Sequence, residues 1–264
     1  MTPEYRDVPL RRRGLNARVL SAGSGEPLLY LHGAIASTGW SPFLDIMAQE
    51  YTVHAPLQPG FGEVEGLESI ADIIDMALYY FDVLDELGIK RVRVVGHFLG
   101  AMVAAEMAAL CPHYVSRLAL SAPTGFWRDD EPVRDIFIMS DDEIREGMWY
   151  DPQSPSAEAV LSEQASDEEK ARRVLERSID LAAAGKLLWP IPDRGLARRI
   201  NRVRAPVLLV WGDTDRVVPL AYAREFSDRL ENAKTAVIPR CGHLPMLEQP
   251  EDLARHVSAF FREP

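Results

Sequence analysis

Short apolar runs alternate with longer amphipathic segments along the 264-residue chain. Several short runs are apolar throughout, as strands buried on both faces of a sheet are, so they predict β-strands. The predicted strands are residues 27–31, 52–57, 91–95, 117–121, 207–211 and 235–238. Between them, residues 69–87 repeat apolar side chains at helical spacing and end before Gly88, a typical C-terminal stop. Helices are also predicted over residues 99–110, 221–230 and 251–261.

Strands that alternate with helices indicate right-handed crossovers and a mostly parallel central sheet flanked by helices. We therefore expect an α/β fold. The alternation breaks at residues 124–200, where Asp, Glu, Arg and Pro are dense and the apolar positions have helical spacing. We expect this segment to be a helical cap or lid inserted into a core made of residues 1–123 and 201–264.

The predicted cap contains several large aromatic side chains, among them Trp127, Phe137, Trp149 and Trp189. Two interpretations stay open. These side chains either line an apolar substrate pocket beneath a lid, or they pack the insertion onto the core.

Charge limits the partners of the chain. The formal net charge is −11, and the longest basic cluster is Arg11-Arg12-Arg13. Binding to nucleic acid or to an anionic membrane needs a basic surface, so neither is expected. The arginine cluster is more typical of a solvated strand edge. Because the first sixteen residues are polar and no apolar run reaches the roughly 18 residues of a spanning helix, we expect a cytoplasmic protein.

Cysteine and glycine spacing indicates no cofactor. Cys111 and Cys241 lie far apart, outside any CxxC pattern, and neither an HExxH motif nor a Cys/His cluster is present. The glycines do not follow the GxGxxG spacing of dinucleotide sites. We predict no disulfide, no metal and no cofactor, and we interpret Cys241 as a packed residue.

A motif at the end of one predicted strand carries the chemistry. Gly96-His97-Phe98-Leu99-Gly100 follows an apolar strand and precedes an alanine-rich helix, which is the setting of the GxSxG nucleophile elbow. Glycines at its two ends let helix and strand approach closely. Phenylalanine stands where the serine of that motif belongs, and we expect the neighbouring His97 to be structural.

An acid and a histidine follow in the order that an elbow hydrolase requires. Two carboxylates, Asp213 and Asp215, come after one strand, and His243 comes after the next. In a triad the histidine takes the proton of the nucleophile and the carboxylate orients the histidine. Asp215 is the favoured acid, and Asp213 stays an alternative that caps the turn. Near the start, a loop after His32 offers backbone N–H groups to an oxyanion.

Taken together, these motifs resemble the α/β-hydrolase family over nearly the whole chain. The resemblance implies that Asp215 is the triad acid and His243 the base. It implies an oxyanion hole made by the N–H of Leu99 with that of Ala34 or Ile35. We expect the substrate pocket to include His32, Gly33, Trp127, Phe137, Trp149 and Trp189, and its ligand to be a small apolar ester or another small molecule.

Phe98 conflicts with the usual reaction of this family, because its ring has neither a lone pair nor an acidic proton. Three interpretations stay open: an esterase-like enzyme whose nucleophile position is disabled, a non-catalytic protein that binds a small ligand, or an enzyme that uses His243 and Asp215 directly as a general base, as a lyase or cofactor-free oxygenase would. The first is favoured, because the retained acid, base and oxyanion loop have no other evident use.

Overall fold

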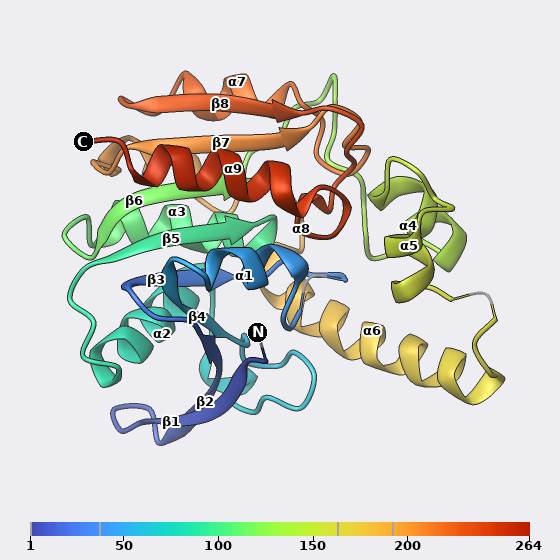
Figure 1. Ribbon diagram of the computed structural model, residues 1–264, viewed down its shortest axis with the longest axis horizontal. Helices are drawn as coiled ribbons and strands as arrows, with labels where there is room; N and C mark the ends of the chain where they lie inside the picture. Colours follow the sequence, from blue (N-terminus) through green and yellow to red (C-terminus); the bar gives the residue numbers. More distant parts are fainter. Residues whose placement is uncertain (1, 37, 163, 192) are drawn as a thin grey trace.

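An eight-stranded sheet forms the centre of the computed structural model, which describes residues 2–36, 38–162, 164–191 and 193–264 (Figure 1). The strand order is β1-β2-β4-β3-β5-β6-β7-β8, with β1 and β2 antiparallel to their neighbours and the rest parallel. The strands are β1 Glu4–Leu10, β2 Leu15–Ala22, β3 Glu26–Leu31, β4 Tyr51–Pro56, β5 Val92–His97, β6 Val115–Ser121, β7 Val207–Gly212 and β8 Ala233–Ile238. The expected α/β fold with a mostly parallel sheet is confirmed.

The sequence analysis did not predict the hairpin formed by β1 and β2. In β1 only Val8 and Leu10 are buried, so most of the strand has the polar composition of a surface segment. The arginine cluster does not lie on a strand edge as predicted. It forms the turn between β1 and β2, where Arg13 is ion-paired with Asp82 of α2 at 2.5 Å.

Helices cover both faces of the sheet. Figure 1 shows α1 and α9 in front of the sheet and α2, α3 and α7 behind it. Their bounds are α1 Pro42–Met47, α2 Ile73–Glu86, α3 Leu99–Leu110, α7 Tyr222–Ser227, α8 Pro245–Glu248 and α9 Pro250–Phe261. Helix α2 begins later than predicted, because the Asp72 side chain accepts from the N–H groups of Ile74 and Asp75 and caps it there. Among the described residues, no helix has the length and apolar character needed to cross a membrane.

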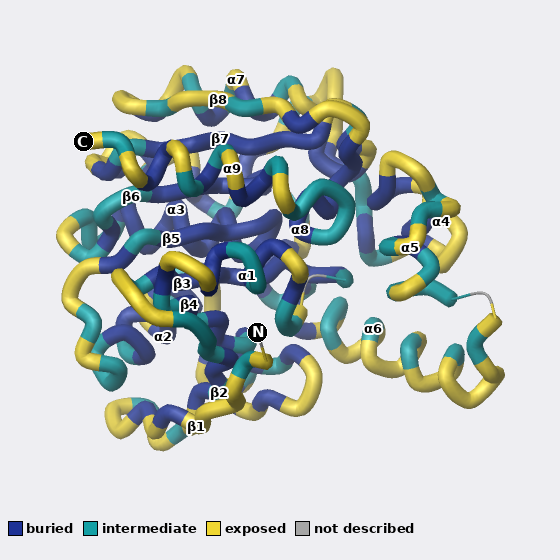
Figure 2. Tube along the Cα trace, viewed as in Figure 1, coloured by how far each residue is buried: buried dark blue, intermediate teal, exposed yellow. Residues whose placement is uncertain are grey.

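Three helices lie between β6 and β7, beyond the ends of the strand arrows (Figure 1). They are α4 Asp141–Met148, α5 Pro155–Val160 and α6 Asp167–Leu188. The first turns of α6 are largely exposed (Figure 2), whereas Ala183, Ala184, Leu187 and Leu188 near its end are buried. Short 3₁₀ turns, Leu196–Arg198 and Ile200–Arg202, then lead back to the sheet.

A buried ion pair joins this returning segment to α3. Glu106 of α3 has no exposed surface, and its two carboxylate oxygens accept from Nε and Nη2 of Arg199, both at 2.7 Å. A bidentate ion pair of this kind fixes the relative orientation of the two side chains as well as the distance between them. Removing the cation would leave a carboxylate without its charge partner in the interior, which is far more costly than the pair is stabilising.

We therefore predict that Arg199→Ala lowers the free energy of unfolding by about 3 kcal/mol. The matched control is Arg224→Ala, because Arg224 pairs with Asp228 while 85% of its side chain is exposed, and its loss should cost at most about 1 kcal/mol. Urea denaturation of both variants measures the difference. Equal midpoints for the two variants would contradict the anchoring role of Arg199.

Candidate active site

The turn between β5 and α3 holds Phe98 in an unusual backbone conformation, with φ 47° and ψ −108°. A positive φ is rare for a bulky residue and is kept only where the surroundings impose it. Here the N–H of Phe98 donates to Ser121 O at 3.0 Å, and its carbonyl accepts from Met102 N in the first turn of α3. Hydrogen bonds to β6, which contains Ser121, and to α3, which contains Met102, therefore hold Phe98 in this conformation.

The two glycines of this turn are required by close packing. A Cβ at Gly96 would lie 2.6 Å from Cα of Ala101, and a Cβ at Gly100 would lie 2.2 Å from Leu31 O. Real Cβ atoms do not approach backbone atoms this closely. Any other residue would push α3 away from the sheet and change the turn that carries Phe98.

Asp215 and His243 form a buried hydrogen-bonded pair. Their side chains are 0% and 1% exposed, and His243 Nδ1 lies 2.9 Å from Asp215 Oδ2. The other carboxylate oxygen accepts from the N–H groups of Val217 and Val218, both at 2.9 Å. An ionised carboxylate only accepts, so Nδ1 carries a proton, and in the neutral form of the ring Nε2 is the atom with the lone pair.

Asp213 lies in a different environment. Its carboxylate accepts from the backbone N–H groups of Arg240 and Cys241, at 3.0 and 3.3 Å, and from the Thr214 hydroxyl at 2.9 Å. It thus joins the loop after β7 to the loop after β8. Of the two candidate acids, only Asp215 contacts His243.

Two rings pack against His243. The Phe98 ring, 3% exposed, meets it nearly edge-on, with centroids 5.1 Å apart and planes at 81°. The His97 ring lies 4.7 Å away and donates from Nε2 to His243 O at 2.8 Å. Burial holds the pKa of His97 well below its usual value, so His97 is neutral. Through this hydrogen bond His97 fixes the main chain of His243, which is a structural role.

His32 shapes the loop after β3. Its Nε2 accepts from Gln58 N at 3.0 Å, so the proton is on Nδ1, which donates to Gly33 O at 2.7 Å. Burial lowers the pKa of His32 to about 4, and the ring therefore stays neutral at physiological pH. The same loop continues into Ala34 and Ile35.

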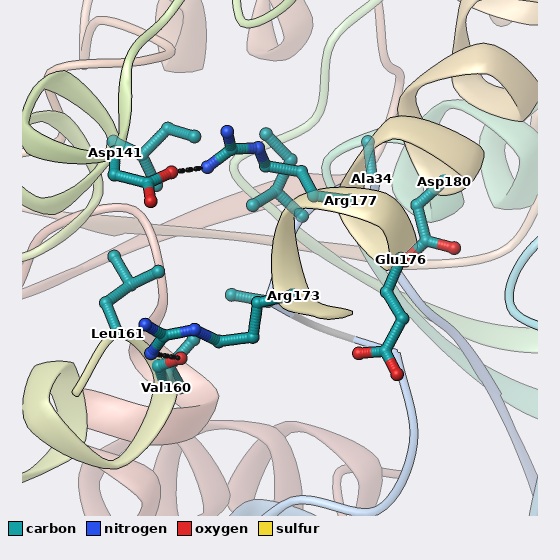
Figure 3. Close-up of a pocket in the computed structure, with 11 residues that line it drawn as sticks. Ala34, Asp141, Val160, Leu161, Arg173, Glu176, Arg177 and Asp180 are labelled. Carbon is teal, nitrogen blue, oxygen red and sulfur yellow. Dashed lines mark hydrogen bonds and ion pairs between the residues drawn. The ribbon is translucent and has the colours of Figure 1, made fainter. Parts of the chain in front are cut away.

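A cavity of about 180 Å³ opens between this loop and the inserted helices (Figure 3). Its walls are Ala34, Ile35, Ala36, Asp141, Ile144, Val160, Leu161, Arg173, Glu176, Arg177 and Asp180. Within it, Arg177 of α6 is ion-paired with Asp141 of α4 (Figure 3). Arg173 donates to two backbone carbonyls, those of Val160 and Ser162, at 3.2 and 3.0 Å. The cavity is therefore partly charged.

The six residues expected to line a pocket do not line this cavity. Trp127 and Trp189 are 39% and 55% exposed, and Phe137 packs edge-on against Trp189. Trp149 is fully buried and donates from Nε1 to Ser156 Oγ inside the insertion. The remaining two, His32 and Gly33, belong to the loop described above. The alternative expectation is packing of the insertion onto the core; the Trp149 ring bonds within the insertion, and its carbonyl accepts from Arg216 of the core at 2.9 Å.

Sequence analysis missed the charged wall of the cavity. Arg173, Arg177 and Asp180 recur at helical spacing and so share one face of α6. That spacing was an available signal. Because charged helical faces usually point to solvent, it did not distinguish a cavity wall from a surface.

Cys241, on the loop that carries His243, adds no reactive thiolate to the site. Cys241 is buried, and burial raises the pKa of its thiol, so it is not a thiolate nucleophile. Within the described ranges, no group of three or more His, Cys, Asp or Glu side chains is placed to hold a metal ion.

Curated relatives match most of the chain. It is 26% identical over 256 residues to the 2-hydroxy-6-oxo-6-(2'-aminophenyl)hexa-2,4-dienoic acid hydrolase of Metapseudomonas resinovorans, covering 94% of this chain and 88% of the relative. It is 29% identical over 256 residues to the pimeloyl-[acyl-carrier protein] methyl ester esterase of Nitrosomonas europaea, covering 88% and 94%.

Solved structures share the fold. A bacterial membrane phospholipase A superimposes with a TM-score of 0.80 at 23% identity, covering 98% of this chain and 86% of that one. The 2-hydroxy-6-oxo-6-phenylhexa-2,4-dienoate hydrolase of a Rhodococcus species gives 0.75 at 22% identity, covering 99% and 100%. The sequence model of the alpha/beta hydrolase family matches residues 28–256, and the chain therefore belongs to that family.

Proposed function

We propose that the chain carries the site of an ester or carbon–carbon hydrolase in which Phe98 occupies the nucleophile position and suppresses hydrolysis. The observation that carries this proposal is the backbone of Phe98 beside His243. A residue held in such a conformation costs about 1–3 kcal/mol. This conformation gives a phenylalanine ring no catalytic role. A serine at a strained turn of this kind has its hydroxyl exposed to the histidine base.

The remaining machinery is assigned as follows. His243 Nε2 takes the proton of a nucleophile, and Asp215 fixes its tautomer and stabilises the imidazolium. The N–H of Leu99, at the start of α3, forms the oxyanion hole with that of Ala34 or Ile35. Ala34 and Ile35 line the cavity, whereas Leu99, Phe98 and His243 do not. The cavity therefore supports the loop's part in this assignment.

The substrate is a small molecule that enters between the core and residues 124–200, which act as the cap. Relatives named as dienoic acid hydrolases and as a methyl ester esterase support a carboxylic ester or an oxo acid. Arg173 and Arg177 stand in the cavity wall among apolar side chains such as Ile144, so an ester or oxo acid with both apolar and polar parts suits the cavity. Exclusion of water by the cap would strengthen electrostatic interactions inside the cavity.

A second candidate is direct general-base chemistry by His243 without a covalent intermediate. It is favoured by one observation: Asp215 holds His243 Nδ1 at 2.9 Å, which leaves Nε2 as the ring nitrogen that can accept a proton. A base poised in this way acts on a substrate proton or on water, provided that the group lies within hydrogen-bond reach.

The first test restores a nucleophile. Phe98→Ser should raise kcat/KM on short-chain nitrophenyl esters by at least about 10³-fold, because loss of a triad serine costs about 10⁶-fold and leaves a residual rate from the remaining site. Phe98→Ala is the matched control, since it removes the ring without adding a hydroxyl. Phe98→Ser/His243→Ala should fall back to the rate of the unmodified chain.

Each outcome of this assay decides between candidates. Equal gains in Phe98→Ala and Phe98→Ser would show that space matters and a nucleophile does not. Inactivity of a folded Phe98→Ser variant would contradict the proposal and favour ligand binding or direct base chemistry. Turnover by the unmodified chain that disappears in His243→Ala would support the second candidate.

The second test separates the two acids in the Phe98→Ser background. Asp215→Asn should lower kcat by about 10³–10⁴-fold, because an amide in place of the carboxylate favours the wrong histidine tautomer. Asp213→Asn keeps one accepting oxygen and loses the bond to the N–H of Arg240 or of Cys241, but Asp213 does not bond to the His243 ring, so kcat should change by less than about tenfold. Steady-state kinetics with matched circular dichroism spectra measure both effects. The reverse order of effects would reject Asp215 as the acid.

A further inference from the structure

The end of α4 is hydrogen-bonded to both loops that hold the acid–histidine pair. We call residues 146–150, which include this end, the α4 strap. The backbone N–H of His243 donates to Met148 O at 2.7 Å. Arg216, which directly follows the acid in sequence, donates from Nη1 to two other carbonyl oxygens of the strap at 2.8 and 2.9 Å. The strap therefore contacts the acid loop and the histidine loop together.

The Glu248 carboxylate also joins the histidine loop to the α4 strap. Oε1 of Glu248 accepts from the backbone N–H groups of Gly242 and Leu244, at 2.9 and 3.2 Å, which are the two neighbours of His243. Oε2 accepts from the N–H of Tyr150 in the strap at 2.7 Å. Glu248 thus holds the chain on both sides of the histidine and ties it to the strap.

The side chain at position 248 must accept hydrogen bonds on two sides, because the N–H groups of Gly242 and Leu244 donate to one of its oxygens and that of Tyr150 donates to the other. A carboxylate offers two accepting oxygens, whereas an amide of the same shape offers one oxygen and one NH₂ donor. With glutamine at this position, the NH₂ group would face either the N–H of Tyr150 or those of Gly242 and Leu244. One side of the contact would then be lost.

Packing leaves the strap and the histidine loop little freedom to separate or slide. A Cβ at Gly242 would lie 2.6 Å from Met148 O, so the two backbones are in direct contact. Trp149 of the strap is fully buried. The same helix contributes Asp141 and Ile144 to the cavity wall, so α4 connects that wall to the histidine loop.

We propose that Glu248 is a positioning residue that locks the His243 loop to the α4 strap and thereby keeps His243 Nδ1 bonded to Asp215. Its consequence for the reaction rests on the proposed role of His243 as the base. Without the lock, the histidine loop can move away from the acid, and the imidazole is then free to sample the other tautomer, in which Nε2 carries the proton and cannot act as a base.

Nuclear magnetic resonance of the full chain, with Phe98 unchanged, tests this lock. The ¹⁵N shifts of the His243 ring report its tautomer, and amide exchange reports the Gly242, Leu244 and Tyr150 hydrogen bonds. We expect a single Nδ1–H tautomer in the unmodified chain and a mixture in Glu248→Gln. Hydrogen exchange at the backbone amide that faces the new NH₂ group should become about tenfold faster. A tenfold change corresponds to the loss of one hydrogen bond of about 1.4 kcal/mol.

The matched control is Asp72→Ala, which removes another carboxylate that accepts two backbone N–H groups, at the start of α2. It should leave the His243 tautomer unchanged. Glu248→Ala should show the full loss, and Glu248→Gln serves if the alanine variant does not fold. A single Nδ1–H tautomer with unchanged amide protection in a folded Glu248 variant would overturn the proposal, as would an equal change in Asp72→Ala.

This readout needs no turnover, so it is distinguishable from a failure of the proposed function. Should Phe98→Ser be active, Phe98→Ser/Glu248→Gln should lower kcat while KM stays within about twofold, because Glu248 does not line the cavity. Glu248→Asp, which keeps both accepting oxygens on a shorter side chain, should recover part of the loss. A change confined to KM would contradict a positioning role.

Discussion

The contact between β5 and α3 holds the backbone of Phe98 in a conformation that few residues adopt, and the geometry of the site depends on it. Gly96 and Gly100 leave no room for a Cβ, so the helix begins directly against the sheet. The strain, about 1–3 kcal/mol, persists because the surrounding packing outweighs it. Packing of α3 against the sheet therefore keeps the residue at position 98 in this conformation, with its side chain beside His243.

Around this turn, three buried histidines have their protons placed by hydrogen bonds. His32 and His97 are neutral because burial penalises their charged forms, and each fixes a stretch of main chain. Of the three, and within the part of the chain that the structure describes, only His243 has a carboxylate, that of Asp215, bonded to its ring. A positive charge that develops during a reaction is therefore best stabilised on His243, and the other two rings act as scaffold.

The elbow and the acid–histidine pair were predictable because each motif lies directly after a strand, where side chains of parallel strands meet. The β1–β2 hairpin was missed because only a few of its positions are buried. The aromatic residues predicted to form a pocket do not line the cavity. Composition does not tell whether a side chain faces solvent or the interior, and Trp127 and Trp189 are both exposed. The contact between Glu248 and Tyr150 left no local signal, because the two residues lie 98 positions apart in the chain.

The most direct measurement of the central claim is covalent labelling at position 98. Treatment of Phe98→Ser with an alkyl fluorophosphonate, followed by intact-mass and peptide analysis, should show one phosphonyl group on the introduced serine, because its hydroxyl faces the His243 base. The unmodified chain should gain no mass, and Phe98→Ser/His243→Ala should react far more slowly. An unlabelled but folded Phe98→Ser variant, or labelling of the unmodified chain, would contradict the assignment of this turn as the nucleophile position.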